Sequence, residues 1–388
     1  MKRNITIISA LVTVLAVIAI VLMAMGPFDE RGLDYTVNSD GKTCTITGVG
    51  SCKVKKVNIP EQMDGYQVTA IGSNLFYGYR TRVSKNQEGP IYSKLKEITI
   101  PESVTSIGSG AFYGCDQLEE IVLPSGLQSL GNAVFYNCTG LKTIVIPDTL
   151  QSLGDAVFYN CQSLERMTIP DAITKIGQGM FYDCHALAEL NFSEQVTEIG
   201  NLAFYGCSSL QELTVPVGVT EINDWMFAHC TSLKKVTLPD GVTLIGQRAF
   251  SSCTNLETIE MPESLLSVGA YAFFGCKNLK EITFSDALKN MDVYAFSKCM
   301  GLTSVTLSDS LTEILGRTFE DCTSLTELVI PASVTKLGSA IFVNSNVQTV
   351  RYAGTIAQWE AIEKESSWHS ISKFDQVICA DGIVSLTE

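Results

Sequence analysis

The sequence predicts a solenoid of stacked 23-residue coils, and three regularities support this prediction. Eleven blocks keep strict phase, each block carries phenylalanine at one fixed place, and each ends in a short segment in which apolar and polar residues alternate. A unit of this size is too small to bury its own apolar side chains, whereas stacked copies bury them against one another. We therefore expect about 12 coils that share one interior.

The phenylalanine column is the strongest regularity, and it predicts a continuous buried ladder. Cysteine follows each phenylalanine by three places in the first ten blocks, from Cys115 to Cys322, and Ser345 stands there in the eleventh. Stacked side chains point in parallel, and no CxxC pair is present, which argues against disulfides or a metal site. We expect these cysteines to behave as small buried apolar residues. The phenylalanines are Phe112, Phe135, Phe158, Phe181, Phe204, Phe227, Phe250, Phe273, Phe296, Phe319 and Phe342.

Each block also contains one strand signal and one turn signal. The segment "LKTIVIP" at 141–147 typifies the strand, because its apolar residues alternate with a polar one and successive copies would pair in parallel. In most blocks the strand segment ends at a proline, which is Pro147 in this copy. Seven places after this proline column stands a residue type that tolerates positive φ, which predicts a left-handed bend there. That column holds Gly108, Gly131, Gly154, Gly177, Gly200, Asn223, Gly246, Gly269, Asp292 and Gly338, with Leu315 as the exception.

These columns, typified by "SVTSIGSGAFYGC" at 103–115, resemble the BspA-like leucine-rich repeats of microbial surface proteins. The resemblance implies a leucine-rich repeat solenoid of right-handed β/short-helix coils with a parallel sheet on the concave face. It also implies an N-terminal β-hairpin cap at 34–59, a repeat region at 60–345 and a C-terminal cap at 346–388. The pair Asp40-Gly41 is a hairpin turn signal in its own right. Thr355 and Gln358 form a capping box for a short helix.

The N-terminal residues predict a membrane anchor or a signal peptide. Residues 1–4 include two cations, residues 5–25 are uncharged and long enough to span a bilayer, and 26–33 form a linker. We favour an uncleaved transmembrane anchor with the short basic end in the cytoplasm. The alternative is a signal peptide that is cut near Ala24 to release the protein. Either way the body of the protein works outside the cytoplasm.

One insertion interrupts the repeat at 77–95. Its basic residues make it either a partner site or a tolerated surface insertion. They are Arg80, Arg82, Lys85 and Lys94, with Lys96 following.

Composition excludes several functions. The net charge of -14 opposes binding to nucleic acid and to anionic membrane surfaces. The three histidines, His185, His229 and His369, belong to no catalytic or phosphate-binding motif. We expect no enzyme activity, no cofactor and no metal. One disulfide, between Cys44 and Cys52 in the cap, is plausible outside the reducing cytoplasm.

Three surface columns are candidate binding sites, and each has an alternative. The exposed strand position suits docking on the concave face, or it merely reflects strand propensity. A tyrosine column offers rigid amphipathic area for a partner, or it only packs. An acidic column could bind calcium or a basic partner, although solvation and turn hydrogen bonds also explain it. The strand column includes Thr168, Asn191, Thr214, Thr237, Glu260 and Thr283; the tyrosines are Tyr77, Tyr113, Tyr136, Tyr159, Tyr182 and Tyr205; and the acids are Glu102, Asp148, Asp171, Glu194, Asp240, Glu263, Asp286 and Asp309.

These features predict a cell-surface, non-enzymatic recognition or adhesion protein. Its expected partner is a protein or glycan on a host or neighbouring cell, and its own N-terminal segment lies in the membrane. The expectation of adhesion rests on the family resemblance. The alternative is a structural surface spacer or coat protein without a specific ligand.

Overall fold

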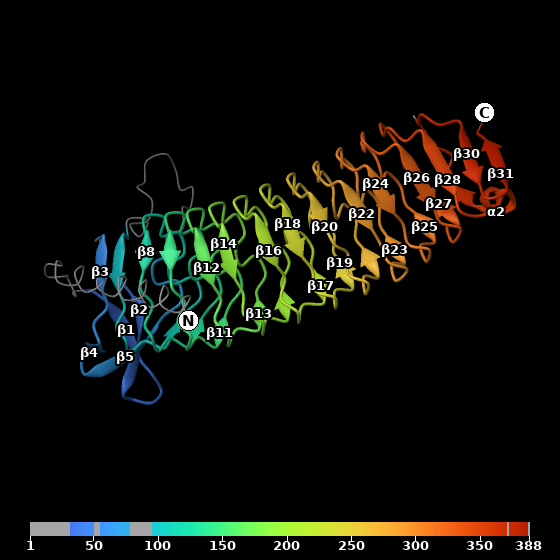
Figure 1. Cartoon of the computed structure of the whole chain (residues 1–388). Helices are drawn as coiled ribbons and strands as arrows, with labels where there is room; N and C mark the ends of the chain where they lie inside the picture. The colour runs from blue at the N-terminus through green and yellow to red at the C-terminus, as the bar shows by residue number, and fades with distance from the viewer. Residues whose placement is uncertain (1–31, 50–54, 78–94, 371, 387–388) are drawn as a thin grey trace, which may run out of the picture.

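The chain forms one elongated β-solenoid of about 14 turns in the computed structural model (Figure 1). The structure describes residues 32–49, 55–77, 95–370 and 372–386. The predicted count of about 12 covers only the coils that carry a phenylalanine of the ladder, from Phe76 to Phe342. The described ends of the chain, which the sequence assigned to the caps, extend the rod on both sides (Figure 1).

The "LxxIxI" segments form a first ladder of short parallel strands, as their period-two pattern predicts. The pairing is in register, so Glu120 lies beside Thr143 and Arg166 beside Glu189. The strands are β3 (Lys56–Asn58), β6 (Glu97–Thr99), β8 (Glu120–Ile121), β10 (Thr143–Ile144), β12 (Arg166–Thr168), β14 (Glu189–Asn191), β16 (Glu212–Thr214), β18 (Lys235–Thr237), β20 (Thr258–Ile259), β22 (Glu281–Thr283), β24 (Ser304–Thr306), β26 (Glu327–Ile330), β28 (Thr349–Tyr352) and β30 (Gln376–Cys379).

A second strand ladder, which the sequence did not predict, runs along the segments that precede the glycine column. Most of its strands contain two residues, too few for a periodic pattern to stand out. Its members are β5 (Tyr66–Ile71), β7 (Ser106–Ile107), β9 (Ser129–Leu130), β11 (Ser152–Leu153), β13 (Lys175–Ile176), β15 (Glu198–Ile199), β17 (Glu221–Ile222), β19 (Leu244–Ile245), β21 (Ser267–Val268), β23 (Asn290–Met291), β25 (Glu313–Ile314), β27 (Lys336–Leu337) and β29 (Glu363–Lys364).

The phenylalanine ladder fills the interior, as predicted. Every ring from Phe76 to Phe342 is at most 1% exposed. Neighbouring rings stack nearly parallel, with centroids from 5.2 Å (Phe273 to Phe296) to 6.3 Å (Phe319 to Phe342) apart. This offset stacking combines large apolar burial with a favourable ring geometry. No coil can therefore lose its ring without exposing a ring of the next coil.

The cysteine ladder lies beside the phenylalanines and is buried, as predicted. Each thiol donates a hydrogen bond to a phenylalanine carbonyl of an earlier coil, for example Cys138 Sγ to Phe112 O at 3.1 Å. The same bond recurs through Cys322, whose Sγ lies 3.2 Å from Phe296 O. Burial raises the pKa of these thiols well above the ordinary value of 9.0, to about 12 for Cys230. Free, protonated thiols therefore suit this interior.

The predicted left-handed bend at the glycine column is wrong, and the reason for glycine there is steric. None of these glycines has positive φ among the described residues. A Cβ on Gly154 would instead lie 2.5 Å from the backbone carbon of Gly131 and 2.6 Å from the amide nitrogen of Asn132. The coils approach so closely at these glycines that an added side chain would collide with the backbone of the preceding coil.

Positive φ occurs instead two residues before and two residues after each phenylalanine of the ladder from Phe112 to Phe342. The first position includes Ala133 (φ 55) and Ala156 (φ 53), and the second includes Asn137 (φ 59) and Asn160 (φ 57). A left-handed residue interrupts a right-handed helix. The phenylalanine segments are consequently turns, and the short helices implied for the coils are not formed there.

The corrected geometry makes opposite predictions for two neighbouring residues. Gly154→Ala should destabilise the protein by about 2 kcal/mol, because its Cβ would collide with the backbone of the preceding coil. Ala156→Gly should stabilise it by about 1 kcal/mol, because glycine adopts the required positive φ without strain. Urea unfolding followed by circular dichroism measures both. A neutral Gly154→Ala would contradict the close approach of the coils at position 154, and a destabilising Ala156→Gly would contradict the strained positive φ at position 156.

Both ends of the rod carry the expected local structures. In the N-terminal part, β1 (Asp34–Val37) pairs antiparallel with β2 (Thr43–Gly48), and Gly41 in the turn has φ 64. The strand β4 (Gln62–Met63) pairs antiparallel with β5. In the C-terminal part, α2 (Ile356–Ala361) begins at the predicted capping box of Thr355 and Gln358. The strand β31 (Gly382–Ser385) pairs antiparallel with β30 and ends the first ladder.

Several predictions fall on residues outside the described ranges. They are the anchor or signal segment at 5–25, the basic residues of the insertion from Arg80 to Lys94, and Cys52. Cys44 is buried, with its Sγ 3.7 Å from the carbonyl oxygen of Tyr66, so its pairing with Cys52 stays a prediction. Within the described residues, none of the helices is both long and apolar enough to span a bilayer.

Candidate recognition surface

The first strand ladder presents one continuous exposed row of side chains. Strand alternation buries Met167, Leu213 and Val236 and leaves the next residue in solvent. In-register pairing then aligns Thr168 with Asn191 and Thr214 with Thr237. The structure thus brings the six predicted strand residues into one line, which we call the strand row: Thr168, Asn191, Thr214, Thr237, Glu260 and Thr283, all exposed.

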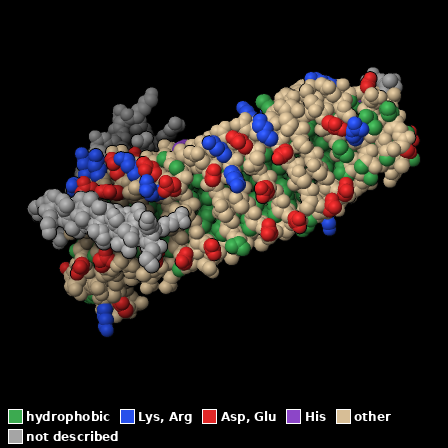
Figure 2. Space-filling model, in the orientation of Figure 1, with side chains coloured by type: hydrophobic (Ala, Val, Ile, Leu, Met, Phe, Trp, Pro, Cys, Tyr) green, Lys and Arg blue, Asp and Glu red, His purple; other side chains and the backbone are tan. Residues whose placement is uncertain are grey.

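The strand row is bordered by charges and interrupted by apolar residues. Lys142 and Glu119 form an ion pair at 2.6 Å, and Lys56 and Glu97 form another at 2.7 Å. Near one end of the rod the row continues with Val145, which is 74% exposed. Figure 2 shows acidic side chains spread along the length of the rod, with apolar patches between them. The row therefore offers polar and apolar contacts that the fold itself does not use.

The predicted tyrosine column forms a ladder of stacked rings. From Tyr113 to Tyr205 the ring centroids are 4.3 to 4.6 Å apart, and the Tyr159 and Tyr182 planes differ by 2°. Tyr77 joins the ladder at 4.7 Å from Tyr113 with a tilt of 42°. The rings are half-buried and cover one another's faces. Such stacking occupies the ring faces within the ladder, and it favours the packing alternative.

Burial also affects the ionisation of the tyrosine ladder. It raises the pKa of the Tyr159 hydroxyl well above its usual range, and the neighbouring hydroxyls of Tyr136 and Tyr182 add to the rise. Burial likewise raises the pKa of Tyr205, again with a contribution from Tyr182. These hydroxyls stay protonated at neutral pH and can donate hydrogen bonds.

Sequence reasoning ended this ladder at Tyr205, but the structure continues it from a different column. Arg248 lies between two rings, 4.6 Å from the centroid of Trp225 and 4.5 Å from that of Tyr271. Tyr271 in turn stacks on Tyr294 at 4.5 Å. Cation–π contacts of this kind are attractive when the guanidinium is desolvated. The stacked surface groups therefore continue beyond Tyr205, through Trp225 and Arg248 to Tyr271 and Tyr294.

The two columns exchange small and large residues. In the four blocks from Tyr113 to Tyr182, where the column after phenylalanine carries tyrosine, the column two places before phenylalanine is small, whereas Leu202 before Tyr205 and Tyr271 before Phe274 are exceptions. The small residues are Gly110, Ala133, Ala156 and Gly179. Where the first column shrinks to Ala228 or Ser251, the second enlarges to Trp225 or Arg248. A large side chain from one column or the other therefore fills the same volume at the surface of the coil. Comparing both columns block by block would have revealed this compensation in the sequence.

The acidic column shows hydrogen bonding between coils. Glu102 accepts hydrogen bonds from the amide and hydroxyl of Ser125, at 2.9 and 2.8 Å. Asp286 accepts one from the amide of Asp309 at 3.2 Å. In the described part of the chain no group of three or more His, Cys, Asp or Glu side chains is arranged to hold a metal. Hydrogen bonds to the next coil therefore supply partners for the carboxylates of Glu102 and Asp286.

Two of the histidines lie near the end of the tyrosine column. His185 Nε2 is 3.6 Å from Asp183 Oδ1, and the His229 ring centroid is 5.1 Å from that of Tyr205. Burial raises the pKa of Asp183, and the two histidines act in the opposite direction. Both histidines are exposed, as expected for surface substitutions.

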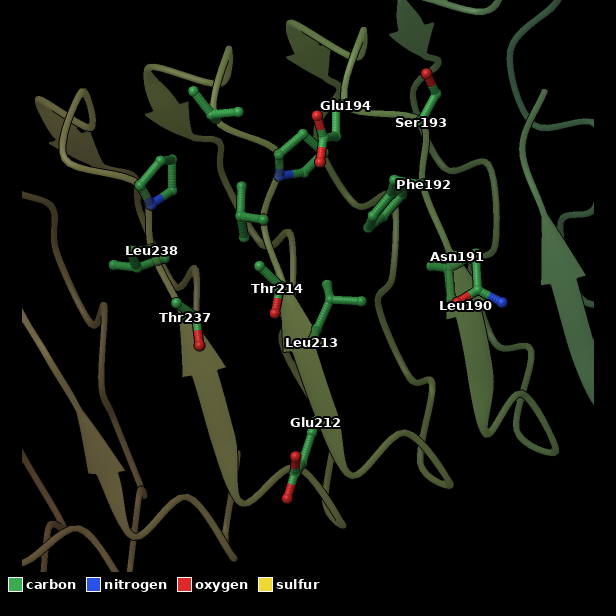
Figure 3. Close-up of a pocket in the computed structure, with 14 residues that line it drawn as sticks. Leu190, Asn191, Phe192, Ser193, Glu194, Glu212, Leu213, Thr214, Thr237 and Leu238 are labelled. Atoms are coloured by element: carbon green, nitrogen blue, oxygen red, sulfur yellow. The ribbon is translucent and has the colours of Figure 1, made fainter. Parts of the chain in front are cut away.

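Among the described coils, both ladders are unpaired at two junctions, the one between β10 and β12 and the one between β14 and β16. The strand β14 pairs with β12, and β16 pairs with β18, but neither β14 with β16 nor β15 with β17 is paired. A hollow of about 550 Å³ lies there (Figure 3). Its walls include Leu190, Phe192, Thr214, Pro216 and Val217. The strand row passes directly along this hollow, because Asn191, Thr214 and Thr237 line it.

Comparison with known proteins agrees with the repeat and the fold. A family model described as the BspA type leucine-rich repeat region matches residues 91–208, 174–276 and 244–364. The solved structure of a leucine-rich cell surface protein from Faecalibacterium prausnitzii is 28% identical, with a TM-score of 0.59 over 89% of this chain and 100% of that one. A leucine-rich repeat protein from Bacteroides ovatus is 26% identical, with a TM-score of 0.68 over 90% of this chain and 99% of that one. No curated protein matches this sequence.

The matched segments together cover residues 91–364, which is more than half of the 388-residue chain. They include all eleven phased phenylalanines, from Phe112 to Phe342, and the stacked coils of the structure repeat with the same period. The chain therefore belongs to the family of BspA type leucine-rich repeat proteins.

Proposed function

We propose that this chain is a non-enzymatic recognition and adhesion protein of the cell surface. It binds a protein or glycan of a host or neighbouring cell through the side of the rod, and its N-terminal segment anchors it in the membrane. The observation that carries this proposal is the strand row, whose side chains are aligned over successive coils and exposed. The row lies outside the buried ladders that hold the coils together.

Two comparisons support this proposal. The family resemblance associates such repeats with surface proteins, and the similar Faecalibacterium prausnitzii structure is titled a cell surface protein. An elongated solenoid also suits recognition, because stacked repeats create an extended lateral surface. The strand row is the better candidate within that surface, because the tyrosine rings already use their faces on one another.

A matched pair of variants tests the strand row. Thr168→Lys with Thr214→Lys should weaken binding of the full-length protein to matrix proteins, glycan arrays or epithelial cells by at least about tenfold, because long cations would fill the row. The control, Thr174→Lys with Thr220→Lys, adds the same charge to the same coils next to the second ladder, where both threonines are also exposed. It should leave binding unchanged.

Other results would lead to other conclusions. If the wild-type protein binds none of these targets, the spacer or coat alternative gains support. Equal loss in both lysine variants would mean that net charge, and not the strand row, decides binding. A third variant, with Tyr136, Tyr159 and Tyr182 changed to serine, reports separately on the tyrosine ladder. Circular dichroism verifies that each variant is folded.

A further inference from the structure

The open junction between β14 and β16 combines several departures from the repeat. Phe192 stands where other coils carry Leu123, Ile146 or Ile169. Val217 stands in the acidic column, where most coils carry aspartate or glutamate, and it is 70% exposed. Phenylalanine alone does not open the coil, since Phe284 occupies the equivalent place while β22 still pairs with β24. The junction between β10 and β12 is likewise unpaired in both ladders, but there Gly177 holds the place that Asn223 holds here.

Asn223 takes the hydrogen bond that would close the second ladder. Its side-chain Nδ2 donates to the carbonyl of Ile199 at 2.7 Å, whereas in the next coil the backbone amide of Gly246 donates to the carbonyl of Ile222 at 2.7 Å. The phenylalanine side stays closed, with Phe204 N bonded to Met226 O at 3.0 Å. The two coils therefore separate as a wedge that opens on the strand side.

The wedge leaves backbone groups available along its edges. In the flanking coils the amide of Ile169 donates to Asn191 O at 2.9 Å, and that of Val215 donates to Thr237 O at 3.0 Å. The equivalent bond from Phe192 to Thr214 is not formed between these two described residues. Unpaired strand edges are the groups that an added extended segment uses.

The side chains of the hollow define what such a segment would carry. Leu190, Phe192, Pro216 and Val217 make an apolar wall, and Figure 3 shows the carboxylates of Glu194 and Glu212 at opposite ends of it. Both acids are exposed, and neither forms an ion pair with a described residue. Two unpaired carboxylates flanking an apolar hollow favour a ligand that is apolar at its centre and cationic at an end.

We propose that this hollow docks an extended peptide segment of a partner protein that carries a basic residue next to apolar ones. The inference rests on the recognition function proposed above and assigns it a place and a partner class. A volume of about 550 Å³ is ordinary for a small-ligand site and fits part of a peptide. A glycan is disfavoured, because the one aromatic ring of the hollow, Phe192, is half-buried and packs at 67° to the Phe204 ring.

Selection of random peptides tests this proposal. A phage-displayed library of random linear peptides is panned against the full-length protein, and the recovered peptides are synthesised and their affinities measured. The expected result is enrichment of peptides with lysine or arginine beside apolar residues. Glu194→Lys with Glu212→Lys should weaken these peptides by at least about tenfold. Glu281→Lys, in the column of Glu212 but three coils away, should not.

A second pair of variants tests the wedge without changing its acids. Asn223→Gly with Val217→Asp restores the residue types of the other coils, and it should also lower affinity at least about tenfold. The matched control is Asp292→Gly with Ala332→Asp, which makes the same kinds of change at the equivalent columns in coils away from the hollow. Thermal unfolding confirms that all variants are folded.

The proposal is overturned if no peptide is enriched, if the enriched peptides lack cations, or if both variant pairs bind them as the wild type does. Binding on a glycan array without peptide binding also overturns it and leaves the recognition function standing. If the hollow variants keep full binding to cells or matrix while the strand-row variant loses it, the site is wrong and the function is right. Failure of every binding experiment removes both.

Discussion

Raising the pH to about 10 is expected to unfold the protein, because the ten stacked thiols ionise only when the coils open. Burial raises the pKa of each thiol from Cys115 to Cys322 above the ordinary value of 9.0. A raised folded-state pKa stabilises the fold below the ordinary pKa, and this contribution is lost as the pH rises toward the folded value. At one pH unit above the ordinary pKa, ionisation favours the unfolded chain by about 1.4 kcal/mol per thiol.

Ten thiols together give about 14 kcal/mol, which is comparable to the whole stability of an ordinary domain. Circular dichroism against pH, in the presence of a reductant, measures the transition, and thiolate absorbance should appear with unfolding and not before it. Cys184, Cys207 and Cys230 changed to alanine should make the transition less steep and move it to higher pH. Thiolate absorbance that rises near pH 9.0 while the circular dichroism stays native would show that these thiols are not protected.

Removing one ring from the phenylalanine ladder is expected to cost about 3–5 kcal/mol, as measured for large buried aromatics in other cores. Phe181→Ala deletes a ring that is 0% exposed and stacks on Phe158 and Phe204 at 5.6 and 5.8 Å. Neighbouring coils share that interior, so the loss weakens two interfaces at once. Urea unfolding gives the free-energy change, and limited proteolysis should show new cleavage near this coil.

Two further variants test whether the loss of stability is specific to removal of the buried Phe181 ring. Phe181→Leu keeps most of the volume and should cost much less, under about 2 kcal/mol. Tyr182→Ala, one residue along but half-buried, should also cost less than Phe181→Ala. If Phe181→Ala and Tyr182→Ala proved equally harmful, the surface ladder would contribute as much as the core.

The columns that depend on burial could be predicted from the sequence. Phe112 and its equivalents, the cysteines and the alternating strand residues repeat because one interior recurs. The structure buries the phenylalanines and cysteines completely and most of the inward strand residues, with Leu190 and Phe192 only partly buried. The Asp40-Gly41 turn and the Thr355 capping box also form, since each depends on a few neighbouring residues. Local chemistry and strict period were enough for these elements.

Features that depend on the distance between coils could not be predicted in the same way. Gly154 suggested a left-handed bend, because sequence alone does not show that a neighbouring backbone lies 2.5 Å from its absent Cβ. Ala156 gave no sign of its positive φ, since alanine has no preference for that conformation. The hollow beside Phe192 was likewise hidden, because it depends on how two coils are spaced and on contacts such as the Asn223 side-chain bond to Ile199 of another coil.

The thiol hydrogen bonds give the rod a direction of growth. Each cysteine donates to a carbonyl that lies 26 residues earlier in most coils, so its acceptor has always been synthesised first. A chain that is synthesised from its N-terminus can therefore add coils vectorially, each new turn closing on a template that is already in place.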